Sequence, residues 1–410
     1  MAQKKRSNRS VAAAMIGTAL EYYDMSLYGL MAPLLISIFL PGVDKLDALI
    51  LTFVMTPISI IVRPIGAVVI GRIGDIYGRK RALLISIGGM AAVTGMIGAL
   101  PDYQSIGYLA PISFVIFRSL QGFFLAGEYN GAAIFSLEHS DTSRQGYVSG
   151  LYSMYTVVGI LFATTVATTI SYLPEKYWRI PYFIGFIAGF LGLYMRKLIY
   201  ETPDFIKNQK QSIPRSDLEN IANYKRALVA ISVSGLFGAL CIMPTILMNS
   251  LLPIATSFSL STIMLINTIT TVISMLLYPV FGKLADRIGL NQSMQYSIIG
   301  ILILSYPLIS LLETNKLENI ILMKLGFAIL MAWFIGPFNA WIQQLFHTKE
   351  RYSLISLFFS IGYQLGGFTA PLSLLVWKHL KSFSAIYTIL MFFSLCALIS
   401  LMFLRKQGRN

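Results

Sequence analysis

Long apolar stretches alternate with short polar segments along the whole chain. Each stretch holds about 20 mainly apolar residues, enough for a helix to cross a hydrocarbon core of about 30 Å. Runs such as Leu83-Leu84-Ile85 are apolar at consecutive positions, unlike the alternating strands of a membrane barrel. The pattern therefore predicts an all-α integral membrane protein. Its twelve transmembrane helices are predicted at residues 12–39, 48–70, 82–100, 109–137, 147–171, 180–198, 228–252, 258–281, 293–312, 319–346, 353–377 and 384–404.

Composition and charge agree with this pattern. The 410 residues are 56% hydrophobic and only 12% charged, whereas a soluble domain is about 25% charged, which excludes an ordinary cytosolic enzyme. The formal net charge is +14, and most of the lysines and arginines lie in the loops on the side that carries both termini. The positive-inside rule places that side in the cytoplasm. The charge thus reflects topology, and nucleic acid is not an expected partner.

The sequence lacks the residue patterns that several kinds of chemistry require. Cys241 and Cys396 both lie inside apolar spans, and no spacing typical of a disulfide framework, redox pair or metal site is present. No nucleophile–base set is visible, so we expect neither an enzyme nor a bound metal or covalent cofactor. The basic start of the chain is interpreted as a cytosolic tail, because Glu21 and Asp24 interrupt the run that follows. The lack of an organelle presequence fits a bacterial inner membrane.

The spans divide into two equal sets. Residues 199–227 form a polar connection, which separates a six-helix bundle at 1–198 from a second at 228–410. The two sets also echo each other, because the glycine and aspartate spacing of 71–78 recurs at 282–289. Parallel repeats of this kind are found in transporters that bind their solute between the two halves. The repeat therefore predicts alternating access.

Several motifs in the spans and loops are specific enough to compare with known families. The segment at 71–81 resembles the signature between helices 2 and 3 of the Major Facilitator Superfamily. Five further motifs resemble the metabolite:proton symporter branch of that superfamily: Ala19-Leu-Glu21-Tyr22-Tyr23-Asp24, Arg63-Pro64-Ile65-Gly66, Arg118-Ser-Leu-Gln121-Gly122, Arg179-Ile-Pro181 and Glu201-Thr202-Pro203. Gly127-Glu128-Tyr129-Asn130-Gly131 looks most like proline and glycine-betaine transporters. The resemblance implies a proton-coupled carrier with no cofactor other than the proton.

Carboxylates within the spans are candidates for proton coupling. An acid inside hydrocarbon is costly and is a functional candidate by default, which applies to Glu21, Asp24 and Glu128. Each has a structural alternative, namely an ion pair with Arg63 or Arg118, or a brace between helices. Arg118 stays charged at any relevant pH, so it either sets the state of a nearby acid or holds a substrate carboxylate.

The remaining candidates concern the solute and the gate. Aromatic faces suit a quaternary ammonium group, and polar groups in mid-span suit a cavity. The substrate-binding candidates are Tyr23, Tyr28, Arg118, Gln121, Tyr155, Trp333, Asn339 and Gln364. From the resemblance, the repeated loops are expected to gate the cytoplasmic face through Gly71, Asp75, Gly78, Arg79 and Asp286. Arg63 is expected either to anchor at the interface or to pair with an acid, and Lys324 is expected to snorkel.

The interpretation is a monomeric symporter in the bacterial cytoplasmic membrane, which imports a small organic solute with protons. The preferred solute is a zwitterion such as proline or a betaine. The first alternative is an organic acid such as a 2-oxo dicarboxylate or citrate, and another is proton-driven efflux. A transport-inactive receptor on the same fold is a further alternative.

Overall fold

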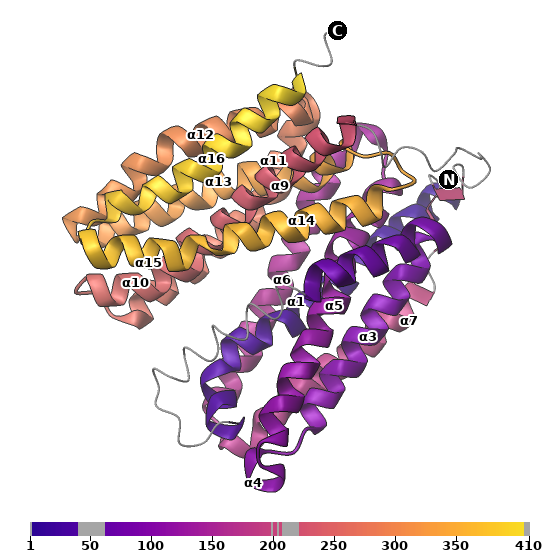
Figure 1. The fold of residues 1–410 in the computed structure, drawn as a ribbon, viewed down its shortest axis with the longest axis horizontal. Coiled ribbons are helices and arrows are strands. Elements are labelled where there is room, and N and C mark those ends of the chain that lie inside the picture. Colours follow the sequence, from indigo (N-terminus) through magenta and orange to yellow (C-terminus); the bar gives the residue numbers. More distant parts are fainter. Residues whose placement is uncertain (1, 40–61, 198–199, 203–204, 207–220, 406–410) are drawn as a thin grey trace. The chain divides into compact units, whose positions relative to one another are not determined.

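The structure, a computed structural model, describes the chain apart from residues 1, 40–61, 198–199, 203–204, 207–220 and 406–410. All regular secondary structure in these described ranges is helical (Figure 1). Nine helices in them are long and apolar enough to cross a membrane. The helix expected at 48–70 lies mostly outside the described residues, although 62–77 is helical.

The chain divides into two compact units. Unit 1 contains Met1–Ser140, Tyr155–Gln211 and Thr348–Leu357, and unit 2 contains Asp141–Met154, Ser212–His347 and Phe358–Asn410. Each unit therefore includes a short segment from the other half of the sequence. The division expected at 198 and 228 stays a prediction.

Unit 1 is built from helices of the first half of the sequence. They are α1 (Ala2–Phe39), α3 (Arg79–Ala99), α4 (Tyr103–Ile106), α5 (Leu109–Glu138), most of α6 (Gln145–Ser171), the 3-10 turn η2 (Glu175–Arg179) and α7 (Ile180–Lys197). The start of α6, preceded by the turn η1 (Thr142–Arg144), belongs to unit 2. Helix α3 lies along both α5 and α7 (Figure 1).

Unit 2 repeats this design in the second half. Its elements are α9 (Ile221–Cys241), the π-helix η4 (Ile242–Leu247), α10 (Met248–Ala255), α11 (Leu260–Ile288), α12 (Leu290–Ser310), η5 (Leu311–Thr314), α13 (Leu317–Gln343), α14 (Arg351–Gly367), α15 (Thr369–Leu380) and α16 (Phe383–Arg405). The start of α14, up to Leu357, belongs to unit 1.

The span expected at 353–377 is wrong as a single helix. It is divided at Phe368 into α14 and α15. Pro371 lies in the first turn of α15, where its missing N–H costs nothing, but its ring would clash with the carbonyl four residues earlier if one helix continued. A new helix therefore begins after Gly367.

The repeated loops share a backbone feature that explains their glycines. Gly78 and Gly289 end the two echoing segments, with φ of 106° and 97°. These angles lie in the region that residues with a Cβ rarely adopt. Each glycine lets the chain turn sharply from one helix into the next, so the sequence echo corresponds to an equivalent local structure in each unit.

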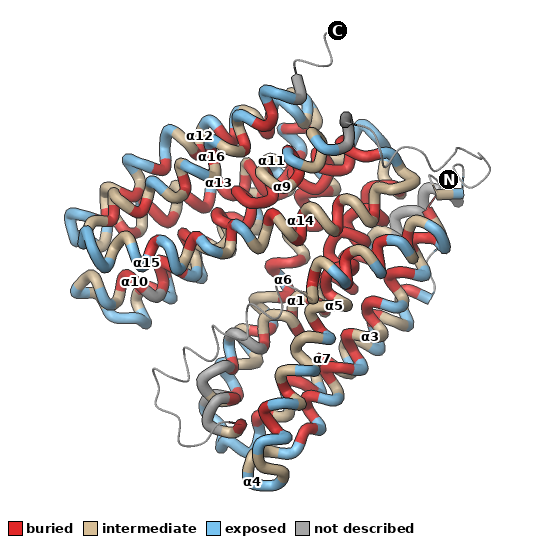
Figure 2. The backbone as a smooth tube through the Cα atoms, viewed as in Figure 1, coloured by how far each residue is buried: buried red, intermediate tan, exposed pale blue. Residues whose placement is uncertain are grey.

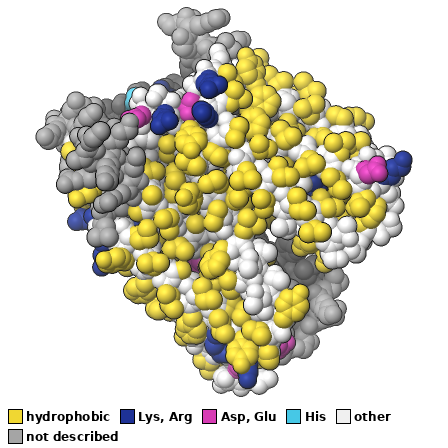
Figure 3. Space-filling model, turned by 180° about the vertical axis from the view of Figure 1, so that it is seen from behind, with side chains coloured by type: hydrophobic (Ala, Val, Ile, Leu, Met, Phe, Trp, Pro, Cys, Tyr) yellow, Lys and Arg dark blue, Asp and Glu magenta, His cyan; other side chains and the backbone are white. Residues whose placement is uncertain are grey.

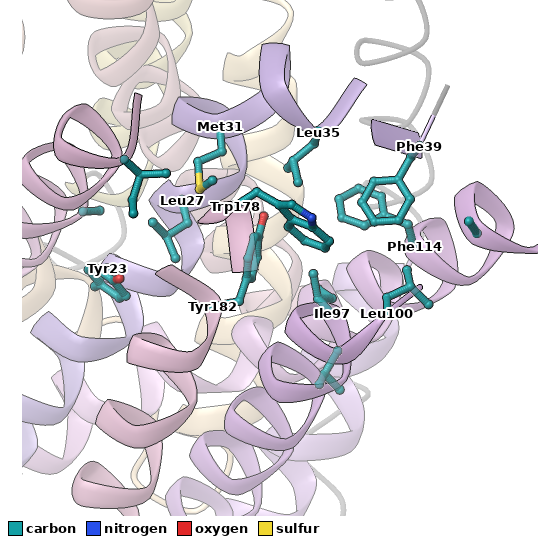
Figure 4. Packing of buried hydrophobic residues seen from close by; sticks show 14 residues of the cluster. Tyr23, Leu27, Met31, Leu35, Phe39, Ile97, Leu100, Phe114, Trp178 and Tyr182 are labelled. Carbon is teal, nitrogen blue, oxygen red and sulfur yellow. The ribbon is translucent and has the colours of Figure 1, made fainter. Parts of the chain in front are cut away.

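A cluster of buried apolar side chains fills one end of unit 1 (Figure 4). Trp178 is its centre, with the ring of Phe39 at 5.4 Å and that of Tyr182 at 6.0 Å between centroids. Leu27 of α1 and Ile97 of α3 are fully buried in the same cluster. The cluster therefore joins α1, α3 and α7 through the turn that precedes α7.

Large apolar side chains also cover the outside of the helices. Ile187 is 66% exposed, Ile303 is 63% exposed and Phe392 is 61% exposed. Figure 2 shows buried and exposed positions along the same helices, and Figure 3 shows hydrophobic side chains over most of the described surface in view. A helix that is apolar on its exposed side as well as its buried side is typical of a membrane span.

Close backbone approach gives a test of this packing. A Cβ at Gly66 would overlap the carbonyl oxygen of Phe123, whereas a Cβ at Gly88 would lie 3.6 Å from the Leu193 side chain. We therefore expect Gly66→Ala to destabilise the protein by about 1–3 kcal/mol through overpacking. Gly88→Ala is the matched control and is expected to change stability by less than about 1 kcal/mol. The thermal midpoint in detergent measures both; equal midpoints would contradict the packing.

Candidate functional site

The most deeply buried ion pair of unit 1 joins Glu128 of α5 to Arg196 of α7. Both side chains are fully buried, and Nη1 of Arg196 donates to Oε1 of Glu128. The same Nη1 lies 3.4 Å from the backbone oxygen of Leu83 on α3. Space for the guanidinium exists because Gly17 of α1 has no side chain: a Cβ there would lie 2.7 Å from Nη2 of Arg196. The pair therefore links α5 and α7 beside α1 and α3.

Glu21 of α1 lies next to this pair. Its side chain is buried, and the charges of Glu128, Arg196 and Arg63 all act on it. Arg63, in the helical segment 62–77, is only 9% exposed, so it does not anchor at an interface. The structure thus brings together two acids and two guanidinium groups, of which Glu21, Glu128 and Arg63 are candidates from the sequence.

Asp24 is held differently, by neutral hydrogen-bond donors. The Thr94 hydroxyl and the Gln121 amide nitrogen both donate to Asp24 Oδ2, the latter at 3.1 Å. Gln121 also accepts from Nη1 of Arg118 at 2.5 Å, so Gln121 lies between the acid and the guanidinium. Asp24 and Gln121 are buried, and Arg118 is half-buried. A carboxyl group in this setting can exchange a proton without losing an ion-pair partner.

The signature loop of unit 1 is centred on Asp75. Asp75 accepts from the backbone nitrogens of Tyr352 at 3.1 Å and Ser353 at 2.9 Å, and from the Ser353 hydroxyl at 2.6 Å. It also pairs with Arg79 at 2.9 Å. Burial raises the pKa of Asp75, while Arg79 and the Ser353 donors act to lower it. The aspartate therefore holds the first turn of α14 within unit 1.

Arg79, Glu138, Arg351 and Gly71 complete this arrangement. Arg79 is fully buried, donates to the backbone oxygen of Gly74 at 2.7 Å and lies 3.5 Å from Glu138. Glu138 in turn pairs with Arg351 at 3.2 Å. Gly71 is needed because a Cβ there would lie 2.5 Å from the Ser353 backbone.

Asp286 has the equivalent place in unit 2. Its carboxylate accepts from the backbone nitrogens of Gly146 at 2.7 Å and Tyr147 at 2.9 Å, at the start of α6. Each repeated aspartate therefore holds the amino-terminal end of a helix, where exposed backbone N–H groups favour a negative charge.

The residues expected to bind the solute are divided between the two units. Tyr23 is fully buried in the apolar cluster and donates to the Pro181 oxygen at 3.0 Å, which favours packing (Figure 4). Tyr155 and Gln364 are half-buried. Asn339 donates to Ser153 at 3.3 Å. The Tyr28 side chain lies outside the described residues.

Trp333 is an expected solute contact that has both an aromatic face and a polar group able to bind a solute. Its ring is stacked on Phe281 with centroids 6.0 Å apart. In the part of the chain that the structure describes, its indole N–H has no hydrogen-bond partner although it is buried. An aromatic face with an unused donor is suited to a polar solute.

Several members of these networks, among them Arg196, Thr94 and Glu138, are not candidates from the sequence. Arg196 falls at the predicted cytoplasmic end of a span, where basic residues are usually exposed. Thr94 and Glu138 carry no distinctive pattern in the sequence. The sequence does give one indication of the pair, because a charged Glu128 within an apolar span predicts a buried cation beside it. No group of residues able to hold a metal ion occurs within the described ranges.

The buried pair predicts a large effect of removing one partner. Arg196→Met leaves the Glu128 carboxylate without its cation. We therefore expect the free energy of unfolding to fall by about 3–5 kcal/mol. Combining it with Glu128→Gln should restore part of the stability, because the uncompensated charge is gone. Lys197→Met, at the exposed neighbouring position, is the control. Thermal midpoints that are the same for Arg196→Met and Lys197→Met would refute the pair.

The Asp75 contacts give a second prediction. Asp75→Asn removes the negative charge that pairs with Arg79 and accepts three hydrogen bonds. We therefore expect the free energy of unfolding to fall by about 1–3 kcal/mol. Asp102→Asn is the same chemical change at a half-buried helix cap, where asparagine is equally suitable. A midpoint for Asp75→Asn that matches Asp102→Asn would argue against these contacts.

Comparisons with known proteins agree with the fold. The family model of the Major Facilitator Superfamily matches residues 14–371. The proline/betaine transporter of Escherichia coli K12 is 29% identical over 389 residues, which cover 89% of this chain and 77% of that protein. The proline/betaine transporter of Salmonella typhimurium LT2 is 30% identical over the same shares.

Solved structures give the same result. The proton:xylose symporter XylE superposes with a TM-score of 0.77 at 16% identity, covering 98% of this chain and 96% of its own. FucP in its outward conformation gives a TM-score of 0.70 at 12% identity, over 96% and 98% of the two chains. The predicted helical fold is thereby confirmed, and the chain belongs to the Major Facilitator Superfamily.

Proposed function

We propose that this protein is a proton-coupled symporter, which imports a small zwitterionic solute of the proline and betaine class by alternating access. It acts as a monomer in a bacterial cytoplasmic membrane, with both termini in the cytoplasm. No cofactor other than the coupling proton is required. The chain is a member of a family of transporters, and its relatives are named as transporters, which favours transport over enzymatic catalysis.

The observation that carries the proton coupling is the setting of Asp24. The carboxylate is buried, and Thr94 and Gln121, which donate hydrogen bonds to it, are neutral. Neutral donors remain in place whether or not the acid is charged, so Asp24 can be protonated without leaving a cation unpaired. The Arg118 guanidinium donates to Gln121 and so lies one residue away from the acid.

Glu128 is in a different position. Its protonation would leave the fully buried Arg196 without a full counter-charge. Glu21 lies beside both, and Arg196, the partner of Glu128, also acts on Glu21 together with Arg63. We therefore assign the moving proton to Asp24, and we assign Glu21, Glu128 and Arg196 to a charged cluster that keeps α1, α5 and α7 together.

The class of solute is supported by the named relatives. The Escherichia coli and Salmonella proteins, each matched over 89% of this chain, are named proline/betaine transporters. Trp333 supplies an aromatic face and an unused N–H donor, which suit the cationic and the carboxylate ends of a zwitterion. Asn339 is a further polar group on the same helix, α13.

Gating is assigned to the two repeated aspartates. Asp75 holds the first turn of α14 and Asp286 holds the start of α6. Both contacts are hydrogen bonds to backbone N–H groups at helix starts, and in unit 1 opening would also move the buried Tyr352, whose hydroxyl donates to the Gly127 oxygen at 2.8 Å. We propose that they are formed in one state of the transport cycle and open in the other.

Uptake into proteoliposomes tests the function. An inward proton gradient should drive accumulation of labelled proline or glycine betaine, with 2-oxoglutarate and citrate as the competing class. Asp24→Asn should lower the initial rate at least about tenfold, which is ~1.4 kcal/mol, while exchange of solute across the membrane without a gradient continues. Asp102→Asn, at a helix cap where asparagine is equally suitable, should behave as the parent protein.

Three results would contradict the proposal in different ways. Gradient-driven uptake of the organic acids alone would overturn the zwitterion assignment. Accumulation by Asp24→Asn at the parent rate would overturn the role of Asp24. Solute uptake that ignores the proton gradient in the parent protein would overturn coupling itself.

A further inference from the structure

A buried lysine in unit 2 has no role in the transport mechanism above. Lys324 lies in α13 and is 3% exposed, so the expectation that it snorkels is wrong. Its Nζ donates to the backbone oxygen of Pro244 at 2.8 Å, to Oδ1 of Asn249 at 2.5 Å and to Oδ1 of Asn267 at 3.0 Å. An ammonium group has three N–H donors. All three are therefore used, each by an oxygen from a different element.

The Pro244 oxygen takes part because the helix is irregular there. Residues Ile242–Leu247 form a π-helix between α9 and α10. The backbone N–H of Met248 bonds to Met243 and Thr245, so it does not bond to Pro244, its partner in a regular α-helix. The carbonyl thus loses its usual donor and accepts from Lys324 instead. Short π-helical segments are frequently found at functional sites.

The charge of Lys324 is balanced by neutral groups only. In the described part of the chain, no carboxylate forms an ion pair with it. Its three partners are a backbone carbonyl and two side-chain amide oxygens. Backbone carbonyls at helix irregularities bind Na⁺ in other membrane transporters, and carbonyl oxygens replace the hydration shell of K⁺ in channels.

We propose that the oxygens of Pro244, Asn249 and Asn267 form an alkali-cation site that the Lys324 ammonium occupies. The side chain acts as a cation tethered to α13, and it holds the irregular α9–α10 segment against α11. Because it is tethered to the chain, this group cannot leave the site as a free Na⁺ or K⁺ ion would. Removing the side chain beyond Cβ leaves the three oxygens without a cation and opens the site to a free alkali ion.

The proposal is tested by the thermal stability of Lys324→Ala in detergent, in NaCl, KCl and choline chloride at equal ionic strength. In choline chloride this variant should unfold well below the parent protein. Na⁺ or K⁺ should raise its midpoint in a saturable way, as expected for a ligand that binds only the folded state. The parent protein and Lys316→Ala, an exposed position at the start of the same helix, should show no such difference between the salts.

Two further variants separate binding from a general salt effect. Lys324→Met keeps an apolar side chain in the space and leaves little room for an ion, so its midpoint should be low in all three salts. Lys324→Ala combined with Asn267→Ala should respond more weakly than Lys324→Ala, because one oxygen ligand is gone. An equal response of Lys324→Met and Lys324→Ala would overturn the site.

The remaining outcomes are also decisive. If Lys324→Ala has the same midpoint in all three salts, or folds in none of them, the oxygens do not form a cation site. The readout is stability, so it does not depend on which solute is carried or on proton coupling. Failure of the transport proposal therefore leaves this one intact, and the reverse also holds.

Discussion

The buried Glu128–Arg196 pair is the constraint around which the first half of the protein is arranged. A charge inside a hydrocarbon layer is tolerated only with a partner, and here the partner lies 68 residues later in the chain, on another helix. Gly17 leaves space for the guanidinium, and Glu21 and Arg63 extend the pair into a cluster. The helices of unit 1 are thus held together both by this charged cluster and by the apolar cluster around Trp178.

Against this fixed cluster, Asp24 differs in its partners. Thr94 and Gln121, which donate to it, are neutral, and Arg118 acts on it through Gln121. Lys324 in unit 2 differs again, because its partners within the described residues are neutral oxygens. The charged groups that hold helices together are therefore distinct from the one acid that we assign to change its charge.

Much of the fold follows from the sequence, because apolar runs of helical length have few other structures available in a membrane. The echo of 71–78 at 282–289 also predicts two equivalent loops, and both contain a glycine with positive φ. The break at Phe368 does not follow from the sequence, since α11, α12 and α13 each continue through a proline of their own.

The candidate site is predictable only in part. The acids can be found because charge stands out in an apolar span. Arg196 and the partners of Lys324 cannot, because three-dimensional proximity alone identifies them. The roles assigned to Asp24, Glu21 and Glu128 stay predictions. The central claim among them is that a proton moves with the solute through Asp24. Its most direct test is the pH of a weakly buffered suspension of vesicles that contain the protein, when proline or glycine betaine is added without an imposed gradient. We predict that the outside becomes more alkaline as solute and protons enter together, and that Asp24→Asn vesicles show no such change. Entry of solute into parent vesicles with no change of external pH would contradict the claim.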